Sequence, residues 1–154
     1  MKIIDILPAE CIATNVSVSS KKRVLEKLVE LITVQNPELI EEEIFESLVS
    51  RERLGSTGIG HGVAIPHGRV QTGGKSIGVF LQLQDPIDFD AIDNKPVDLV
   101  FGLLVPKDST DEHLQILANL ASLFSDEAIC EKIRQAENAT EIHALITHSQ
   151  ATTN

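Results

Sequence analysis

Three side chains in this chain have residue types and settings that suit chemistry on an anionic group: His67, His113 and Arg51. His67 ends the short apolar stretch VAIP, with Pro66 before it and Gly68 after it. A neutral imidazole is a good nucleophile near pH 7, because its ordinary pKa is about 6.5. Pro66 fixes the backbone before the ring, and we expect Gly68 to remove a side chain that would crowd a large group arriving there. The local sequence therefore favours His67 as a nucleophile.

Arg51 and His113 are the candidate supports for a phosphoryl group on that ring. The guanidinium of Arg51 offers a planar, bidentate fork to anionic oxygens. The stretch STDE at 109–112 fits a capping box, with Ser109 as the cap and Glu112 reaching back to it. This places His113 in the first turn of a helix, where free N–H groups attract anions. From spacing alone, His113 is equally well interpreted as an exposed residue of the first helical turn that has no functional role.

Other motifs fail as nucleotide or metal sites. GGKS at 73–76 lacks the first glycine of a phosphate-binding loop, and a strand rather than a helix follows it. GSTGIGHG at 55–62 lacks the third glycine of a dinucleotide motif, so we expect a tight, flexible loop. DFDAID at 88–93 has the apolar Ile92 and no glycine where a calcium loop needs an oxygen ligand and a turn, which favours solvated turn carboxylates. Metal-ligand spacing of histidine or cysteine is absent as well, so we expect neither a metal nor a cofactor.

Length and charge indicate a single acidic domain. The chain has 154 residues and a formal net charge of -10, from 13 basic and 23 acidic residues. Such a surface repels nucleic acid and anionic lipid, which need a basic footprint. No apolar run is long enough to span a bilayer, and the N-terminus does not fit a signal peptide, so we expect a cytoplasmic protein without membrane insertion. Cys11 and Cys130 are predicted to be free, buried thiols, and His143 and His148 to be surface helix residues.

The helices and strands around Arg51, His67 and His113 must position these three side chains. Apolar spacing predicts a helix over 20–35 and a second over 37–53. Asn36 followed by Pro37 is expected to end the first helix and to start the second, with Asn36 as its cap and Pro37 in its first turn. Arg51 then lies in the last turn of the second helix, and Gly55 ends it. Strands are predicted at 63–67, at 76–83 with two different faces, and at 97–106 with both faces buried, and 85–96 is turn-rich.

Helices return at 109–124, 126–135 and 139–147. This order predicts one α/β domain over residues 1–150, in which helices cover both faces of a central sheet, followed by a disordered tail at 151–154. The chain contains no internal repeat or linker that would divide it.

Three of these segments, in their order and separation, resemble a known family. RERLGSTGIGHGVAIPHG at 51–68, FDAIDNKPVDLVFGLLVP at 89–106 and EHLQILANLASLF at 112–124 together resemble the mannitol/fructose-type enzyme IIA domain of the bacterial phosphoenolpyruvate-dependent phosphotransferase system. The resemblance extends from about Ile4 to Ile146, and the residues of the three motifs are similar to those of the nitrogen-regulatory branch of that family.

The resemblance implies a mixed central β-sheet flanked by α-helices and a role for each candidate. His67 matches the histidine that accepts the phosphoryl group through Nε2, from a histidine-containing phosphocarrier protein that enzyme I charges with phosphoenolpyruvate. His113 matches the second active-site histidine, which orients the phosphoryl group, and Arg51 matches the active-site arginine. Thr57 falls in the family's ST loop, and the resemblance suggests that it lines the pocket. His61 departs from the family, which has a small or amide residue there more often.

The resemblance leaves two functions open. In the regulatory reading, phosphorylation of the chain is itself the message, and it controls target proteins such as potassium transporters or sensor kinases. In the transport reading, the chain is a sugar IIA component that passes the phosphoryl group to a fructose- or mannitol-type IIB domain. The single free domain and the residues of the three motifs favour the regulatory function over sugar transport. A binding module with an inactive site is disfavoured, because His67, Arg51 and His113 are all present. Ile59 and Val63 are the expected apolar rim for a docking partner.

Overall fold

The computed structural model describes residues 2–109 and 111–152; the side chains of residues 112–113 and 149–152 lie outside this description. Two short 3-10 turns, Ile3–Asp5 and Ala9–Cys11, open the chain. The helices are α1 (Lys21–Gln35), α2 (Glu41–Leu54), α3 (Asp111–Phe124), α4 (Glu127–Gln135) and α5 (Ala139–Thr152). The strands are β1 (Ile12–Val16), β2 (Gly58–Gly60), β3 (Val63–Ala64), β4 (His67–Val70), β5 (Ile77–Ile87) and β6 (Val97–Pro106).

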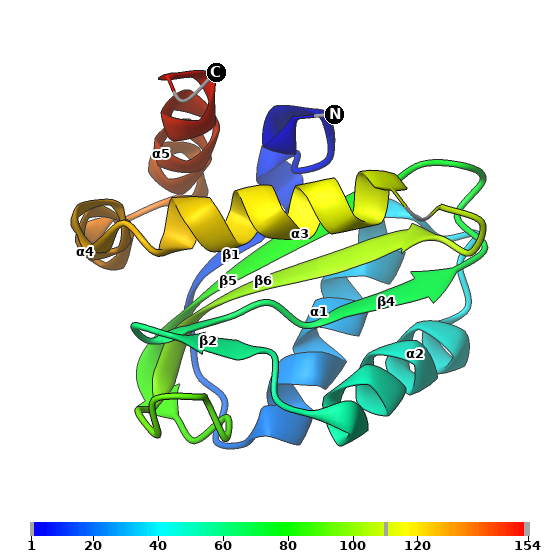
Figure 1. Cartoon of the computed structure of the whole chain (residues 1–154), viewed down its shortest axis with the longest axis horizontal. Coiled ribbons are helices and arrows are strands. Elements are labelled where there is room, and N and C mark those ends of the chain that lie inside the picture. Colours follow the sequence, from blue (N-terminus) through cyan, green and yellow to red (C-terminus); the bar gives the residue numbers. More distant parts are fainter. Residues whose placement is uncertain (1, 110, 153–154) are drawn as a thin grey trace.

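The six strands form one mixed sheet in the order β1-β5-β6-β3-β2, with β4 also paired to β6 (Figure 1). β1 is parallel to β5, β5 is antiparallel to β6, and both β3 and β4 are parallel to β6. β3 and β4 therefore occupy successive parts of the same side of β6, opposite Leu99–Val100 and then Leu103–Pro106. This mixed sheet confirms the predicted single α/β domain.

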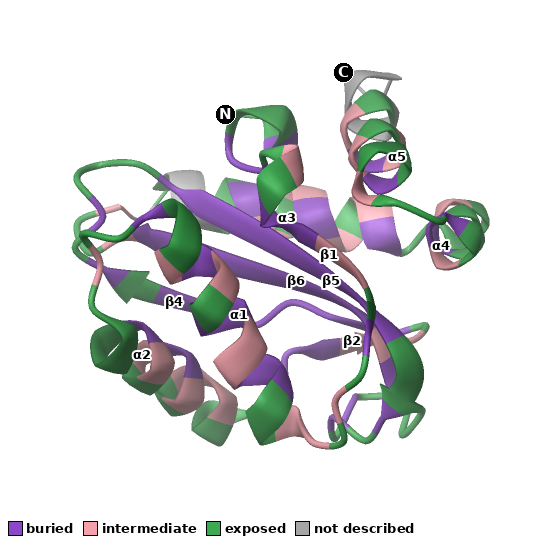
Figure 2. Ribbon diagram, turned by 180° about the vertical axis from the view of Figure 1, so that it is seen from behind, coloured by how far each residue is buried: buried purple, intermediate pink, exposed green. Residues whose placement is uncertain are grey.

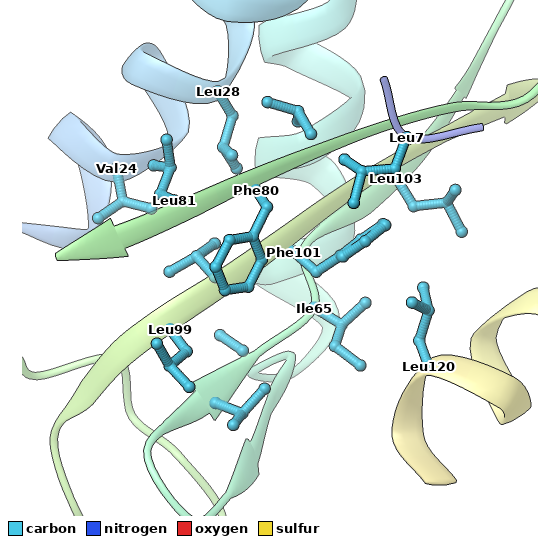
Figure 3. Close-up of a cluster of buried hydrophobic side chains, with 14 of the residues drawn as sticks. Leu7, Val24, Leu28, Ile65, Phe80, Leu81, Leu99, Phe101, Leu103 and Leu120 are labelled. Atoms are coloured by element: carbon cyan, nitrogen blue, oxygen red, sulfur yellow. The ribbon is translucent and has the colours of Figure 1, made fainter. Parts of the chain in front are cut away.

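Helices cover both faces of the sheet. α1 and α2 lie on one face and α3 on the other, as the two opposite views show, while α4 and α5 pack at one end (Figures 1 and 2). Val24 and Leu28 of α1 and Leu120 of α3 reach the strands from opposite sides (Figure 3). The strands β5 and β6 are consequently buried on both faces.

Three phenylalanines pack on the α3 side of the sheet. Phe80 of β5 and Phe101 of β6 lie opposite each other in the sheet. Phe124, the last residue of α3, packs on them, and its ring is stacked on that of Phe80 with the ring centres 5.9 Å apart. All three are fully buried. Aromatic pairs at this separation add stabilisation beyond the area they bury. This cluster fixes α3 on the sheet.

Gln82 is a buried polar residue that joins β5 to β1 and α4. Its Nε2 donates to the carbonyls of Ile133 and Ala136 at 2.8 and 2.9 Å, and its Oε1 accepts from Asn15 N–H at 3.0 Å. Ile133 lies in the last turn of α4 and Ala136 follows the helix, and Ile133 C=O also accepts from Ala136 N–H at 3.2 Å. Gln82 therefore satisfies the C-terminal end of α4 and the irregular point of β1 at once.

Several predicted boundaries hold and one is wrong. Ser20 caps α1 through its side chain, and Gly55 follows α2 as predicted. Asn36 ends α1 as predicted, but it does not cap α2, which begins at Glu41. Both the backbone N–H and the side-chain Nδ2 of Asn36 donate to Ile32 C=O, so this side chain is committed to the preceding helix. Residues 37–40 form a turn.

The strand predictions need three further corrections. β1 was not predicted, and β5 is buried at every position from Ile77 to Leu83 rather than on one face. Part of the expected glycine loop is a strand, because β2 and β3 form a hairpin with His61 and Gly62 at its turn. Both turn residues have positive φ, 58° and 78°, as a tight two-residue hairpin requires. α5 continues to Thr152, and residues 153–154 lie outside the described part.

Candidate functional site

His67 lies at the start of a strand, whereas the sequence predicted it at the end of one. The stretch 63–67 is divided, because β3 ends at Ala64 and β4 begins at His67. Pro66 between them has no N–H to donate, but its carbonyl accepts from Leu103 N–H of β6 at 2.9 Å. The half-buried ring of His67 is therefore held at the edge of the sheet beside the neighbouring helix α2.

The two ring nitrogens of His67 have different partners. Nδ1 lies 2.9 Å from Ile65 C=O, which only accepts, and Nε2 lies 3.2 Å from Arg51 Nε, which only donates. The ring is therefore the neutral tautomer with its proton on Nδ1 and its lone pair on Nε2. Burial lowers the pKa of His67 below its ordinary value, the bond to Ile65 C=O opposes this, and the charge of Arg51 lowers it further. Near pH 7 the ring is in the form that a nucleophile needs.

Arg51 comes from the last turn of α2, as predicted. Its second contact is to Gly55 C=O, which accepts from Nη1 at 2.8 Å. The planar guanidinium is thus fixed at one end by the backbone that closes α2 and directed at His67 by the other. The structure brings together two of the predicted site residues, Arg51 and His67.

His113 lies in the first turn of α3, as the sequence predicted. Its side chain and that of Glu112 lie outside the described part of the structure, so the capping box expected from Ser109 and Glu112 stays a prediction. The role that the resemblance implies for His113 remains a prediction.

The loop after α2 is held by an ion pair that was not predicted from the sequence. Glu52, whose side chain is only 6% exposed, lies 2.7 Å from Lys21 Nζ at the start of α1. It also accepts from the backbone N–H and the hydroxyl of Thr57. Thr57 is buried, so it supports the loop from inside. A spacing of 31 residues between Lys21 and Glu52 gave no signal that they would meet.

A glycine is needed at position 68 for a different reason from the one predicted. A Cβ at this position would come within 3.0 Å of Ser47 Cβ on α2, and closer still to Ser47 Oγ. The missing side chain therefore allows α2 and β4 to approach each other, and it does not clear a path to the ring of His67. The prediction that Gly68 opens access to His67 is wrong.

The expected apolar rim is also corrected. Val63 is fully buried in β3, and Ile59 is partly buried against the core. Leu54, at 83% exposure, is an exposed large apolar residue beside the site, since it precedes Gly55, whose carbonyl holds Arg51.

His61 forms part of a separate surface cluster. Its backbone N–H donates to Asp93, and its Nδ1 lies 3.1 Å from Glu127 Oε1. Asp93 accepts from the backbone N–H groups of Lys95 and His61, and these two bonds lower the pKa of its carboxyl group. Among the described residues no group of three His, Cys, Asp or Glu side chains is placed to hold a metal ion. Cys11 and Cys130 are free and buried, and burial raises the pKa of the Cys130 thiol to about 11.

Comparison with known proteins identifies the class. Residues 5–149 match the family model described as phosphoenolpyruvate-dependent sugar phosphotransferase system, EIIA 2. The chain belongs to this family, and the resemblance seen in its sequence is confirmed. Within the described residues no helix is long and apolar enough to cross a membrane.

Relatives within the family are more specific. The chain is 44% identical over 153 residues to the nitrogen regulatory protein of Escherichia coli, covering 99% of this chain and 93% of that protein. It is 41% identical to the nitrogen regulatory protein of Bradyrhizobium diazoefficiens, covering 99% of both chains. The crystal structure of nitrogen regulatory protein IIA-Ntr from Neisseria meningitidis superposes with a TM-score of 0.89 at 43% identity, covering 94% of this chain and 99% of that one. The predicted similarity to the nitrogen-regulatory branch is therefore also confirmed.

Proposed function

We propose that this protein is a regulatory phosphoryl carrier that accepts a phosphoryl group on His67 Nε2 from a histidine-containing phosphocarrier protein. The observation that carries the proposal is the pair of contacts to the ring, Ile65 C=O at Nδ1 and Arg51 Nε at Nε2. They select the tautomer whose lone pair lies at Nε2, beside a guanidinium that suits phosphoryl oxygens. Membership of a phosphotransferase family supports the same chemistry.

The transfer exchanges one phosphorus–nitrogen bond for another. The Nε2 lone pair attacks phosphorus as the bond to the donor imidazole breaks, and that imidazole keeps the bonding electron pair. The His67 ring gains positive character, which the hydrogen bond from Nδ1–H to Ile65 C=O stabilises. No proton, metal or oxidant is needed, and the bonds made and broken are of the same kind. The transfer is therefore expected to be readily reversible.

Arg51 acts in this scheme by charge and position. Its bond to Nε2 gives way as phosphorus arrives, and the guanidinium, still held by Gly55 C=O, turns to the phosphoryl oxygens. Phosphoryl transfer is catalysed mainly by such positioning and charge stabilisation. His113, which begins α3, is proposed to orient the same oxygens.

The output of the reaction is proposed to be regulatory. The relatives in Escherichia coli and Bradyrhizobium diazoefficiens are named nitrogen regulatory proteins, which supports a signalling role tied to nitrogen. Phosphorylation adds about -1.5 to -2 charges at one surface patch, enough to make or break a protein interface. Potassium transporters and sensor kinases are the proposed classes of target.

A competition experiment separates this function from sugar transport. The phosphorylated protein is mixed with a fructose-type or mannitol-type IIB domain, and the phosphoryl group on each protein is followed by intact mass. A complex of IIA mannitol with phosphorylated IIB mannitol is known in Escherichia coli, so the assay has a positive control. Retention of the phosphoryl group on this chain supports the regulatory function, and rapid transfer to IIB would favour transport.

A further inference from the structure

The free edge of β4 is held by one side chain of α2. Among the described strands β4 pairs only with β6, so the backbone groups of Arg69 that point away from β6 have no strand partner. Ser47 Oγ fills this place: it accepts from Arg69 N–H at 2.9 Å and donates to Arg69 C=O at 3.1 Å. We call this pair of bonds the edge contact.

The edge contact and the Arg51–His67 contact repeat at matching intervals. Ser47 and Arg51 are four residues apart, so they lie on the same face of α2 with about 6 Å of rise between them. His67 and Arg69 are two residues apart, so they lie on the same side of β4 at about 6.6 Å. The helix and the strand therefore run in opposite directions and touch at two points: Ser47 contacts Arg69, and Arg51, one turn further along α2, contacts His67. Fixing one point fixes the other.

Gly68 sets the depth of this contact. It lies between the two contact points on β4, and a Cβ there would run into Ser47 on α2. Ser47 and Gly68 together allow the helix to lie close enough for its serine to reach the strand backbone. Neither residue touches the reacting nitrogen.

We propose that Ser47 is a positioning residue for phosphoryl transfer, which fixes the distance from Arg51 to His67 through the edge contact. This inference rests on the proposed function of His67. It names a residue that acts only through geometry, and the charge and chemistry of the site stay with Arg51 and His67. A displacement of about 1 Å at a reacting centre is enough to cost up to about 100-fold in rate.

The test compares Ser47→Ala with Ser50→Ala in the full chain. Ser50 is an exposed serine of the same helix, and its hydroxyl donates to Glu46 without touching β4. S47A is expected to lower the single-turnover phosphorylation rate constant about 5- to 10-fold, with the half-saturating concentration of donor unchanged. S50A is expected to behave as wild type. Gly68→Ala, which pushes the helix away, is expected to slow the reaction further.

A second readout does not depend on phosphorylation. A nitrogen-15 NMR titration follows the two ring nitrogens of His67 in each variant. If Arg51 moves away, its charge depresses the pKa of His67 less, so this pKa rises in S47A and G68A but not in S50A. An unchanged rate and an unchanged pKa in both S47A and G68A would overturn the positioning role. An unphosphorylated wild type would instead refute the proposed function, while the titration would still decide the role of Ser47.

Discussion

Replacing Arg51 with alanine should slow phosphorylation of His67 by about 10- to 150-fold. The guanidinium lies 3.2 Å from the nucleophilic nitrogen and is held by Gly55 C=O at 2.8 Å, so it is already ordered before a phosphoryl group arrives. A hydrogen bond to a charged group contributes about 1.5–3 kcal/mol, and each 1.4 kcal/mol is a factor of about ten in rate.

The substitution also removes a positive charge beside the ring. The pKa of His67, which burial and then Arg51 lower, should therefore rise towards its ordinary value in R51A. Arg51→Lys should give an intermediate rate, because a single ammonium cannot reproduce the two-ended contact of the guanidinium.

Single-turnover mixing with the phosphorylated donor, quenched and read by intact mass, measures the rate. Arg53→Ala is the matched control, since Arg53 is an exposed arginine of the same turn whose nearest acidic partner is Glu46 at 4.0 Å. Equal rates for R51A, R53A and wild type would refute the assignment of Arg51.

Four further predictions concern pH and stability. The phosphorylation rate should stay level from pH 8 to the ordinary histidine value of 6.5 and fall only below it, because the neutral ring persists to lower pH in the folded protein. Stability should also decrease as pH falls below 6.5, since the unfolded chain then binds a proton that folded His67 resists, and denaturant unfolding at pH 7 and 5.5 measures this difference against H67A. Gln82→Leu should reduce the free energy of unfolding by about 2–4 kcal/mol, because Ala136 C=O and Asn15 N–H both lose the partner that Gln82 provides, whereas the exposed Gln84→Leu should change it little. Glu52→Gln should lower the free energy of unfolding by about 1–2 kcal/mol, which is less than for a fully buried ion pair because Lys21 is 24% exposed. An unchanged denaturation midpoint would contradict the role of the Lys21–Glu52 ion pair in holding the loop after α2.

The long periodic elements were predictable because their residues carry the signal locally. The α1 helix, the β6 strand and the three C-terminal helices follow the apolar spacing of the sequence to within a few residues, α5 excepted at its end. β1 was missed because it is a five-residue strand with an irregular register at Asn15, whose φ is 52°. A strand this short pairs only through tertiary contacts, and it leaves no clear period of its own.

The site was predictable in its chemistry and not in its supports. His67 and Arg51 stand out by residue type and by resemblance to a family, and the structure brings them together. Ser47, Lys21 and Glu52 are ordinary residues of amphipathic helices, and their contacts join elements far apart in the chain. Such partners are set by how the helices pack on the sheet, which spacing within one segment does not encode.

The central claim is tested most directly by the intact mass of the protein after incubation with phosphoenolpyruvate, enzyme I and the histidine-containing phosphocarrier protein, alongside His67→Ala. The account predicts a gain of one phosphoryl group in the wild type and none in the variant. Failure of the wild type to gain mass with active upstream partners, or an equal gain in H67A, would contradict the assignment of His67 as the acceptor.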